Sequence, residues 1–295
     1  MQKYFVIADV HSYYWNLMYS LECAEFDLDN PEHILVSCGD LFDRGSESKE
    51  CLDFVMSIPK ERRIFIMGNH EQNLIELLDE TRPVDESDKH NGTLKTLRDL
   101  SDTKSTKIEN IINGARQNKN LNEYLSELRD YYKTEHFLFV HGWYPWEVID
   151  KDGTETIQIN YKDKNKWWRA RWMCGFSEWY SIRRILDTYP DVKFLNEPVT
   201  VCGHWHTSYG HSRYRGVGEE FPDKGKKWRE HCCFYPYFDE KIIALDACTA
   251  LTHRCNWVIL EEPSGKLIDY YYTQKDRCHD PNLYRRFKKD YNTSF

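Results

Sequence analysis

The chain has 295 residues, a formal net charge of −8 and a pI near 5.9. Hydrophobic residues make up 40% and aromatic residues 15% of it, which is the composition of a folded globular protein and excludes a disordered one. The acidic balance argues against a protein that binds duplex DNA, so nucleic acid is not expected as a partner.

The first residues, MQKYFVIADV, show no signal-peptide pattern and run directly into a predicted strand. No apolar stretch approaches the roughly 20 residues of a membrane-spanning helix, so no membrane association is expected. We therefore expect a cytoplasmic protein with reduced thiols. The ten cysteines include no CxxC pair, which disfavours a structural zinc site.

The first third of the chain alternates apolar runs with segments of helical periodicity. Strands are predicted in KYFVIADV, HILVSCGD and RRIFIMGNH, and helices in SYYWNLMYSLECAEF, SESKECLDFVMSI and EQNLIELLDE, with Ser46 as an N-cap. Three strand–helix units in succession predict a parallel sheet with right-handed crossovers. Ligands of such sheets bind beyond the carboxyl ends of the strands.

The whole chain, 1–295, is predicted to form a single domain, because no Pro/Gly/Ser-rich linker divides it. Residues 81–133 are polar with helical patches and are interpreted as a helical insertion over one edge of the site. A fourth strand is expected in EHFLFVHGWYP and a fifth in PVTVCGHWHTSYGH. EKIIALDACTA and CNWVILEE are interpreted as consecutive antiparallel strands, followed by IDYYYTQ. Residues 209–238 are predicted to be a loop insertion.

Polar residues follow each predicted strand in the order D-x-H, G-D-x-x-D-R-G, G-N-H-E, V-H-G and G-H-x-H. Two-residue spacing lets Asp9 and His11 face one ion, and the two carboxylate oxygens of Asp40 can bridge two ions. Oxygen and imidazole ligands for a second ion are available, and mixed N/O ligation suits Mn, Fe or Zn better than Ca. An EF-hand is excluded because DLFDRGSES lacks the alternating ligands and the final Glu. The candidates for the second ion are Asn69, His141 and His204.

The motifs ADVHS, GDLFDRG, GNHEQ, VHGWYP and GHWHT resemble those of the calcineurin-like metallophosphoesterases. Within that superfamily, DRG followed by GNHE is similar to the phosphoprotein phosphatase branch, and the likeness is greatest to the bacteriophage-type serine/threonine phosphatases. The resemblance implies an α/β fold, a β-sandwich of mixed sheets flanked by helices. It also implies hydrolysis of phosphomonoesters on two divalent metal ions, Mn²⁺ above all, by direct attack of a metal-bridging hydroxide.

The resemblance also implies a role for each site residue. Asp40 would be shared by both metals, His70 would be the general acid, and Asp43 would hydrogen-bond His70 and raise its basicity. The phosphate would be held by Arg44 and Arg169 together with Asn69 and His70, with Arg171 as a weaker candidate. The implied metal ligands are Asp9, His11, Asp40, Asn69, His141 and His204, with His206 as an additional one.

His206 departs from the phage-type pattern, which has G-H-T-P where this chain has G-H-W-H. It matches the second His of the wider superfamily and is expected to bind the first metal; the alternative is a supporting or stacking role beside Trp205. The cluster of Trp167, Trp168, Trp172 and Trp179 is expected to be core.

Phosphoserine or phosphothreonine in proteins is the expected substrate. A symmetrical dinucleoside tetraphosphate, a phosphodiester and, more weakly, an inactive scaffold stay open as alternatives. The partner is accordingly a phosphoprotein or a small phosphoester or nucleotide.

Overall fold

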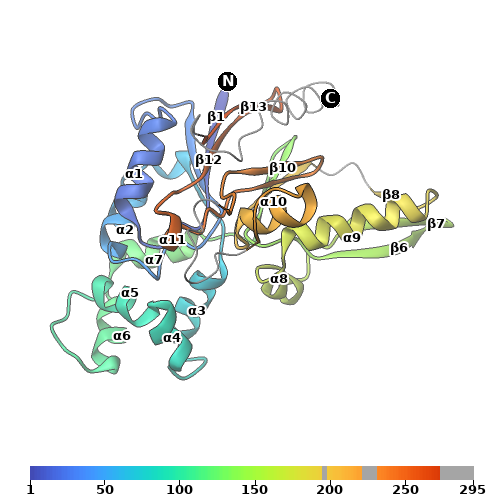
Figure 1. The fold of residues 1–295 in the computed structure, drawn as a ribbon. Helices are drawn as coiled ribbons and strands as arrows, with labels where there is room; N and C mark the ends of the chain where they lie inside the picture. The colour runs from blue at the N-terminus through green and yellow to red at the C-terminus, as the bar shows by residue number, and fades with distance from the viewer. Residues whose placement is uncertain (195–197, 221–230, 273–295) are drawn as a thin grey trace.

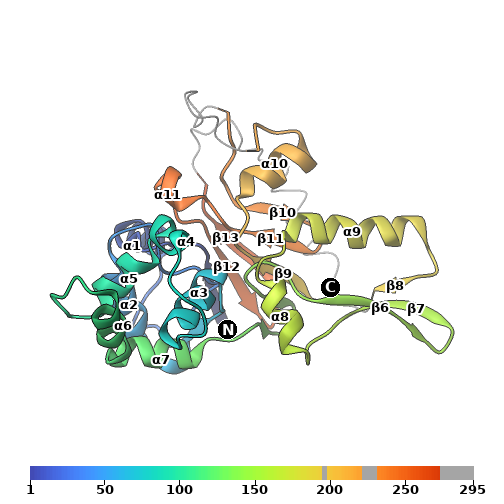
Figure 2. The ribbon, with the colours of Figure 1, turned by 90° about the horizontal axis from the view of Figure 1, so that it is seen from below.

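Two five-stranded sheets face each other in the computed structural model, which describes residues 1–194, 198–220 and 231–272 (Figures 1 and 2). The first sheet has the order β13 (Lys266–Tyr270), β12 (Trp257–Glu262), β1 (Gln2–Ile7), β2 (His33–Ser37) and β3 (Arg63–Phe65). The second has the order β10 (Tyr237–Asp239), β11 (Ile242–Ala244), β9 (Val199–Cys202), β5 (Phe137–Phe139) and β4 (Tyr132–Lys133).

Parallel pairing joins β1, β2 and β3 in the first sheet, as the strand–helix alternation predicts, and β11, β9 and β5 in the second. Val6 lies opposite Val36, and Val36 opposite Ile64, in the parallel pairs β1–β2 and β2–β3. These side chains pack between the sheets against Phe139 and Val201, so the inter-sheet core is apolar from both sides. The crossovers contain α1 (Tyr14–Cys23) and α2 (Ser48–Ser57).

Helices α3 to α7 lie together with α1 and α2 on one side of the sandwich (Figure 2). Helices α1 to α3 and α5 to α7 share one apolar core with the outer face of the first sheet, to which Leu97, Ile111 and Leu121 contribute. Residues 81–133 are largely helical, and this segment both contributes to the core and contacts the loop that follows β2. The helices are α3 (Asn69–Leu78), α4 (Glu86–Asn91), α5 (Thr93–Leu100), α6 (Ile108–Arg116) and α7 (Lys119–Glu127).

A three-stranded sheet projects from the other side together with α9 (Figure 1). This sheet was not predicted, although Asp152 and Gly153 form a turn with positive φ, 55° and 81°, between its first two strands. A D-G pair flanked by alternating residues is a strong hairpin signal. The elements on this side are β6 (Trp146–Lys151), β7 (Thr154–Ile159), β8 (Lys193–Phe194), α8 (Lys164–Ala170) and α9 (Gly175–Thr188).

Three local predictions were wrong. Part of the expected loop at 209–238 is helical, since α10 spans Thr207–Arg215; residues 221–230 lie outside the described part. β11 and β12 do not pair, because β11 joins β9 in one sheet and β12 joins β1 in the other. The N-cap of α2 is Glu47, one residue after Ser46.

Among the described residues, no helix is long and apolar enough to cross a membrane.

Candidate active site

The carboxyl ends of the parallel strands from both sheets converge on one buried group of polar side chains. Asp9 follows β1 and Asp40 follows β2, while His141 follows β5 and His204 follows β9. The short β3 leads into α3, whose first residue is Asn69. The sandwich therefore brings together residues that are up to 195 positions apart, as in the contact between Asp9 and His204.

The loops that carry these residues have unusual backbone geometry. Asp40 has a φ of 55° and Asp43 one of 74°, in the left-handed region that costs a non-glycine residue about 1–2 kcal/mol. Such strain persists only where surrounding contacts fix it, and it concentrates at functional sites. The other non-glycine residues of the predicted motifs with positive φ are Asp9, His11, Ser12, Arg44 and His204.

Asp40 is the centre of the group, with the Nε2 atoms of three imidazoles around its carboxylate. Its Oδ2 lies 3.8 Å from Nε2 of His11 and 3.8 Å from Nε2 of His70. Its Oδ1 lies 3.3 Å from Nε2 of His141. Two sets of side chains could each hold a metal ion, and Asp40 belongs to both: His11–Asp40–His70 and Asp40–His141–His204.

Each imidazole is oriented by a hydrogen bond at its other nitrogen. Nδ1 of His11 lies 2.9 Å from the carbonyl oxygen of Phe42, and Nδ1 of His141 lies 2.7 Å from that of Cys38. A carbonyl only accepts, so Nδ1 carries the proton and Nε2 presents its lone pair to the centre of the site. This arrangement is typical of metal-ligating histidines.

An amide oxygen lies beside the second set. Oδ1 of Asn69 lies 2.8 Å from Nε2 of His141, so both ligand atoms face the same point. The ring of His204 lies 5.0 Å from that of His141. Asp9 is placed differently: both of its carboxylate oxygens accept the backbone N–H of His204, at 3.1 and 3.0 Å, and it belongs to neither set.

Buried negative charge dominates the electrostatics of this group. Burial, followed by repulsion from Asp246 and Asp40, raises the pKa of Asp9 well above its ordinary value. For Asp40 burial acts in the same direction, but the neighbouring imidazoles of His141 and His70 outweigh it and lower the pKa. Carboxylates that are buried together with neutral imidazole nitrogens form a donor set that fits divalent cations.

His70 and Asp43 form a buried pair beside this group. Nδ1 of His70 lies 2.7 Å from Oδ2 of Asp43. Burial alone would lower the pKa of His70, but the carboxylates of Asp40 and Asp43 outweigh it and raise the pKa. The side chain of the adjacent Arg44 is exposed and makes no ion pair among the described residues. The imidazole of His70 in α3 is thus oriented by the loop after β2, which also carries the exposed guanidinium of Arg44.

Glu71, the last residue of G-N-H-E, had no predicted role. Its buried carboxylate accepts the backbone N–H of Asp40 at 2.8 Å, of Leu41 at 2.8 Å and of Gly68 at 3.0 Å. The hydroxyl of Tyr124 in α7 lies 3.4 Å from the same carboxylate. Glu71 therefore fixes the Asp40 loop against the start of α3.

Asp246 was also missed, although it follows the apolar run IIAL at the end of β11 just as the predicted residues follow their strands. It is buried, and its Oδ1 accepts the N–H of Cys248 at 2.7 Å. Its Oδ2 lies 3.9 Å from Nε2 of His206. His206 is thus near Asp246 and outside both sets of ligand atoms.

The predicted basic and aromatic residues of α8 and its surroundings separate into two groups. Arg169 is exposed in the last turn of α8, whereas Arg171 is buried and bonded to Gln72 at 2.8 Å and to Asp130. Arg171 therefore connects the end of α8 to α3. The core prediction for the tryptophans holds for Trp167 and Trp179, which are buried, but was wrong for Trp168 and Trp172, which are exposed.

Comparison with known proteins agrees with this geometry. A family model described as calcineurin-like phosphoesterase matches residues 3–223. The chain belongs to the calcineurin-like phosphoesterase family. The matched region contains every strand end that contributes to the two ligand sets, from β1 to β9. The two ligand sets give this member of the calcineurin-like phosphoesterases side chains that could hold metal ions.

The curated relatives are symmetrical bis(5'-nucleosyl)-tetraphosphatases, matched over short segments. That of Buchnera aphidicola is 36% identical over 96 residues, which is 32% of this chain and 33% of the relative. That of Pasteurella multocida is 38% identical over 71 residues, 24% of this chain and 25% of the relative. The match thus spans a third or less of each relative. A crystal structure of a single-residue mutant of a cold-active protein tyrosine phosphatase aligns with a TM-score of 0.50 at 18% identity, covering 90% of this chain and 77% of that one. This likeness shows the fold alone.

His204 should make the metal-free protein sensitive to acid. Burial, and then repulsion from His141, lowers the pKa of His204 to about 3, against 6.5 for an ordinary histidine. The unfolded chain therefore binds a proton that the folded chain does not as the pH falls from 6.5 towards 3. This group should cost up to about 1.4 kcal/mol of unfolding free energy per pH unit in that window.

The measurement is urea unfolding in a chelator at decreasing pH for wild type and His204→Asn. The wild-type free energy of unfolding should fall more steeply than that of the variant. His90→Asn, which changes an exposed histidine in α4, controls for the substitution. Equal slopes for wild type and His204→Asn would contradict the prediction.

Proposed function

We propose that this chain is a dinuclear-metal-dependent phosphatase that hydrolyses phosphomonoesters, with phosphoserine and phosphothreonine of proteins as its substrates. The observation that carries the proposal is the buried His70–Asp43 pair, whose Nε2 lies 3.8 Å from Asp40 at the centre of the ligand sets. The alkoxide of serine or threonine is a poor leaving group unless it is protonated, so its release requires a positioned acid.

Asp40 would be shared by two divalent cations. When bound, the cations supply an activated water and neutralise the charge of the phosphoryl group. Mn²⁺ suits the mixture of carboxylate, amide and imidazole ligands, and Fe or Zn would also fit. The residues that would hold them are Asp9, His11 and Asp40 on one side and Asp40, Asn69, His141 and His204 on the other, with His206 as a further ligand of the first.

The protein's own residues would hold the phosphate and deliver the proton. Arg44 and Arg169 would bind phosphate oxygens through their guanidinium groups, which hold this anion in a planar, bidentate manner. Asn69 and the ring of His70 would complete the phosphate contacts. His70, protonated at both nitrogens, would donate the Nε2 proton to the leaving oxygen as the P–O bond breaks, while Asp43 stabilises the imidazolium.

A second candidate is the hydrolysis of symmetrical dinucleoside tetraphosphates, because the curated relatives are named for that activity. The same ligand sets and arginines could bind a polyphosphate. The leaving group would be a nucleotide phosphate, which departs as a stable anion and does not need an acid. Replacement of His70 should therefore slow the hydrolysis of a serine or threonine phosphate much more than that of a dinucleoside tetraphosphate.

The experiment compares His70→Asn with wild type on a phosphoserine peptide, diadenosine tetraphosphate, p-nitrophenyl phosphate and bis-p-nitrophenyl phosphate, all with Mn²⁺. Wild type should prefer the phosphoserine peptide. His70→Asn should lose about 10²–10⁴-fold in kcat on the peptide and much less on p-nitrophenyl phosphate, whose leaving group is a stable anion.

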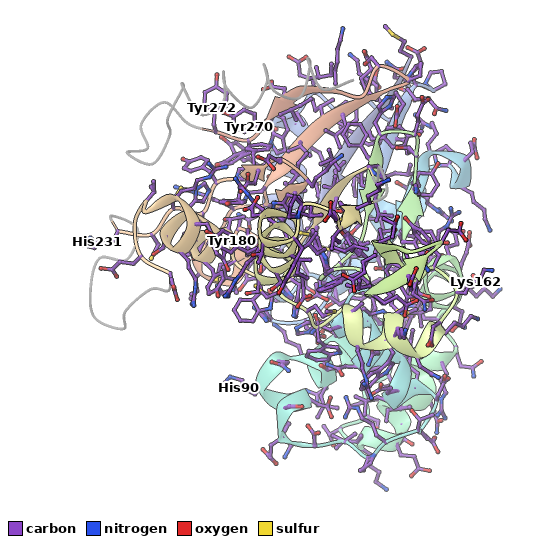
Figure 3. All side chains as sticks on the ribbon, turned by 90° about the vertical axis from the view of Figure 1, so that its right-hand side faces the viewer. His90, Lys162, Tyr180, His231, Tyr270 and Tyr272 are labelled. Atoms are coloured by element: carbon purple, nitrogen blue, oxygen red, sulfur yellow. The ribbon has the colours of Figure 1, made fainter. Side chains whose placement is uncertain are left out.

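The matched control is His231→Asn, which changes an exposed histidine at the periphery of the molecule (Figure 3). A clear preference of wild type for diadenosine tetraphosphate or the diester would overturn the protein-phosphatase assignment in favour of that substrate. No hydrolysis of p-nitrophenyl phosphate with Mn²⁺ would indicate a scaffold. An unchanged kcat of His70→Asn on the peptide would remove His70 as the acid.

A further inference from the structure

The carboxylate of Asp43 is held by more than His70. Its Oδ2 accepts the hydroxyl of Thr93 at 2.7 Å as well as the His70 ring, and its Oδ1 accepts the hydroxyl of Thr96 at 2.8 Å. All four side chains are buried. Both oxygens of Asp43 therefore have fixed donors, and two of the three come from α5 in the helical segment 81–133.

The same part of the chain also holds the backbone of the loop. We call Asn91–Thr96 the clamp segment. The carbonyl of Asn91 accepts the N–H of Arg44 at 2.8 Å, and Nζ of Lys95 donates to the carbonyl of Gly45 at 3.0 Å. Oγ1 of Thr96 lies 3.1 Å from the N–H of Asp43, so this hydroxyl accepts from the backbone of Asp43 while it donates to the carboxylate.

Gly92 allows the close approach between the clamp segment and the loop. Its φ is 92°, and a Cβ placed there would lie 2.9 Å from the backbone nitrogen of Arg44. Asp43 and Arg44 themselves both have left-handed backbones, with φ of 74° and 60°. Two consecutive non-glycine residues in this conformation need contacts that fix them, and the clamp segment supplies these contacts.

We propose that Thr93 and Thr96 are positioning residues that fix the Asp43 carboxylate and, through it, the imidazole of His70. This inference rests on the proposed function, in which His70 donates a proton to the leaving oxygen. Without the two hydroxyls, the carboxylate of Asp43 can rotate and its buried oxygens lose donors. The hydrogen bond from Asp43 then no longer fixes the orientation of the His70 ring. A displacement of an acid from its productive position lowers the rate most where proton transfer is required.

A purely structural role for the threonines would have a different signature. Both lie on α5, and Leu97 of the same helix packs in the core, so a general loosening of α5 would lower turnover of every substrate alike. Valine has nearly the shape of threonine without the hydroxyl, and serine keeps the hydroxyl without the methyl group. The two substitutions therefore separate the hydrogen bonds from the packing.

The experiment compares the double variants T93V/T96V and T93S/T96S on a phosphoserine peptide and on p-nitrophenyl phosphate with saturating Mn²⁺. T93V/T96V should lose about 10- to 100-fold in kcat on the peptide, with KM unchanged and less than about 3-fold loss on p-nitrophenyl phosphate. T93S/T96S should keep most of the wild-type rate. Thr81→Val, an exposed threonine at the start of the same helical segment, is the matched control.

A second readout is independent of turnover. In metal-free protein with labelled histidine, the Nδ1–H resonance of His70, assigned with His70→Asn, should be shifted or lost in T93V/T96V and retained in T93S/T96S. An unchanged resonance, or an equal loss of kcat on both substrates, would overturn the positioning role. If His70→Asn leaves kcat on the peptide unchanged, the proposed function fails. If His70→Asn lowers this kcat but T93V/T96V leaves it unchanged, only the positioning inference fails.

Discussion

Replacing Asp40 with Asn is expected to abolish turnover of every phosphoester. Asp40 is 2% exposed and is the one residue that belongs to both ligand sets. An amide carries no charge and presents one oxygen, so it cannot neutralise two cations. Metal ions contribute several kcal/mol to such reactions, and each 1.4 kcal/mol is tenfold in rate, so we expect a loss of about 10³-fold or more.

Metal analysis of the dialysed protein is the second measurement for Asp40→Asn. The variant should retain less than one equivalent of Mn²⁺ where wild type retains two, and its fold should persist by circular dichroism. Asp79→Asn makes the same chemical change at the exposed end of α3 and should behave as wild type. Full metal content together with full activity in Asp40→Asn would refute a shared ligand.

Of the substitutions proposed here, Glu71→Gln should lower the free energy of unfolding most, although it replaces only one oxygen by an NH₂ group. The carboxylate of Glu71 accepts three backbone N–H groups, from Asp40, Leu41 and Gly68. A glutamine must turn its own NH₂ group toward at least one of these donors. Losing hydrogen bonds to a charged acceptor and leaving a buried N–H unpaired should cost about 3 kcal/mol.

Urea unfolding in a chelator measures this cost directly, without any contribution from bound metal. Glu76→Gln is the matched control, because Glu76 lies on the same helix but is partly exposed and pairs with Arg82. We expect the control to change the free energy of unfolding by less than about 1 kcal/mol. A Glu71→Gln protein as stable as the control would show that the three N–H groups do not depend on the negative charge.

The convergence of the candidate site could be predicted from the sequence because parallel strands place their carboxyl ends at one edge. Asp9, Asp40 and Asn69 follow the three strands of a predicted βαβ series, and the structure brings them together in the first sheet. His141 and His204 follow strands of the other sheet. Their position beside Asp40 depends on how the two sheets pack, which strand periodicity does not specify.

The pairing of the late strands could not be predicted for the same reason. The runs that form β11 and β12 are both short and apolar, and adjacency in sequence favours pairing them as a hairpin. In the structure, α11 (Thr249–Thr252) lies between them, and each joins a different sheet. The alternation in an isolated strand determines which side is buried but does not identify the neighbour.

The sequence by itself determined the residue types of the site, their order and the strand ends on which they lie, because motif spacing and apolar runs are local properties. The tertiary structure alone decided which groups support them. The sequence does not show the role of the supporting residues. They are Glu71 under the Asp40 loop, Thr93 and Thr96 on Asp43, and Asp246 beside Asp9 and His206. Their importance comes from burial and from hydrogen bonds to distant segments, and packing creates both.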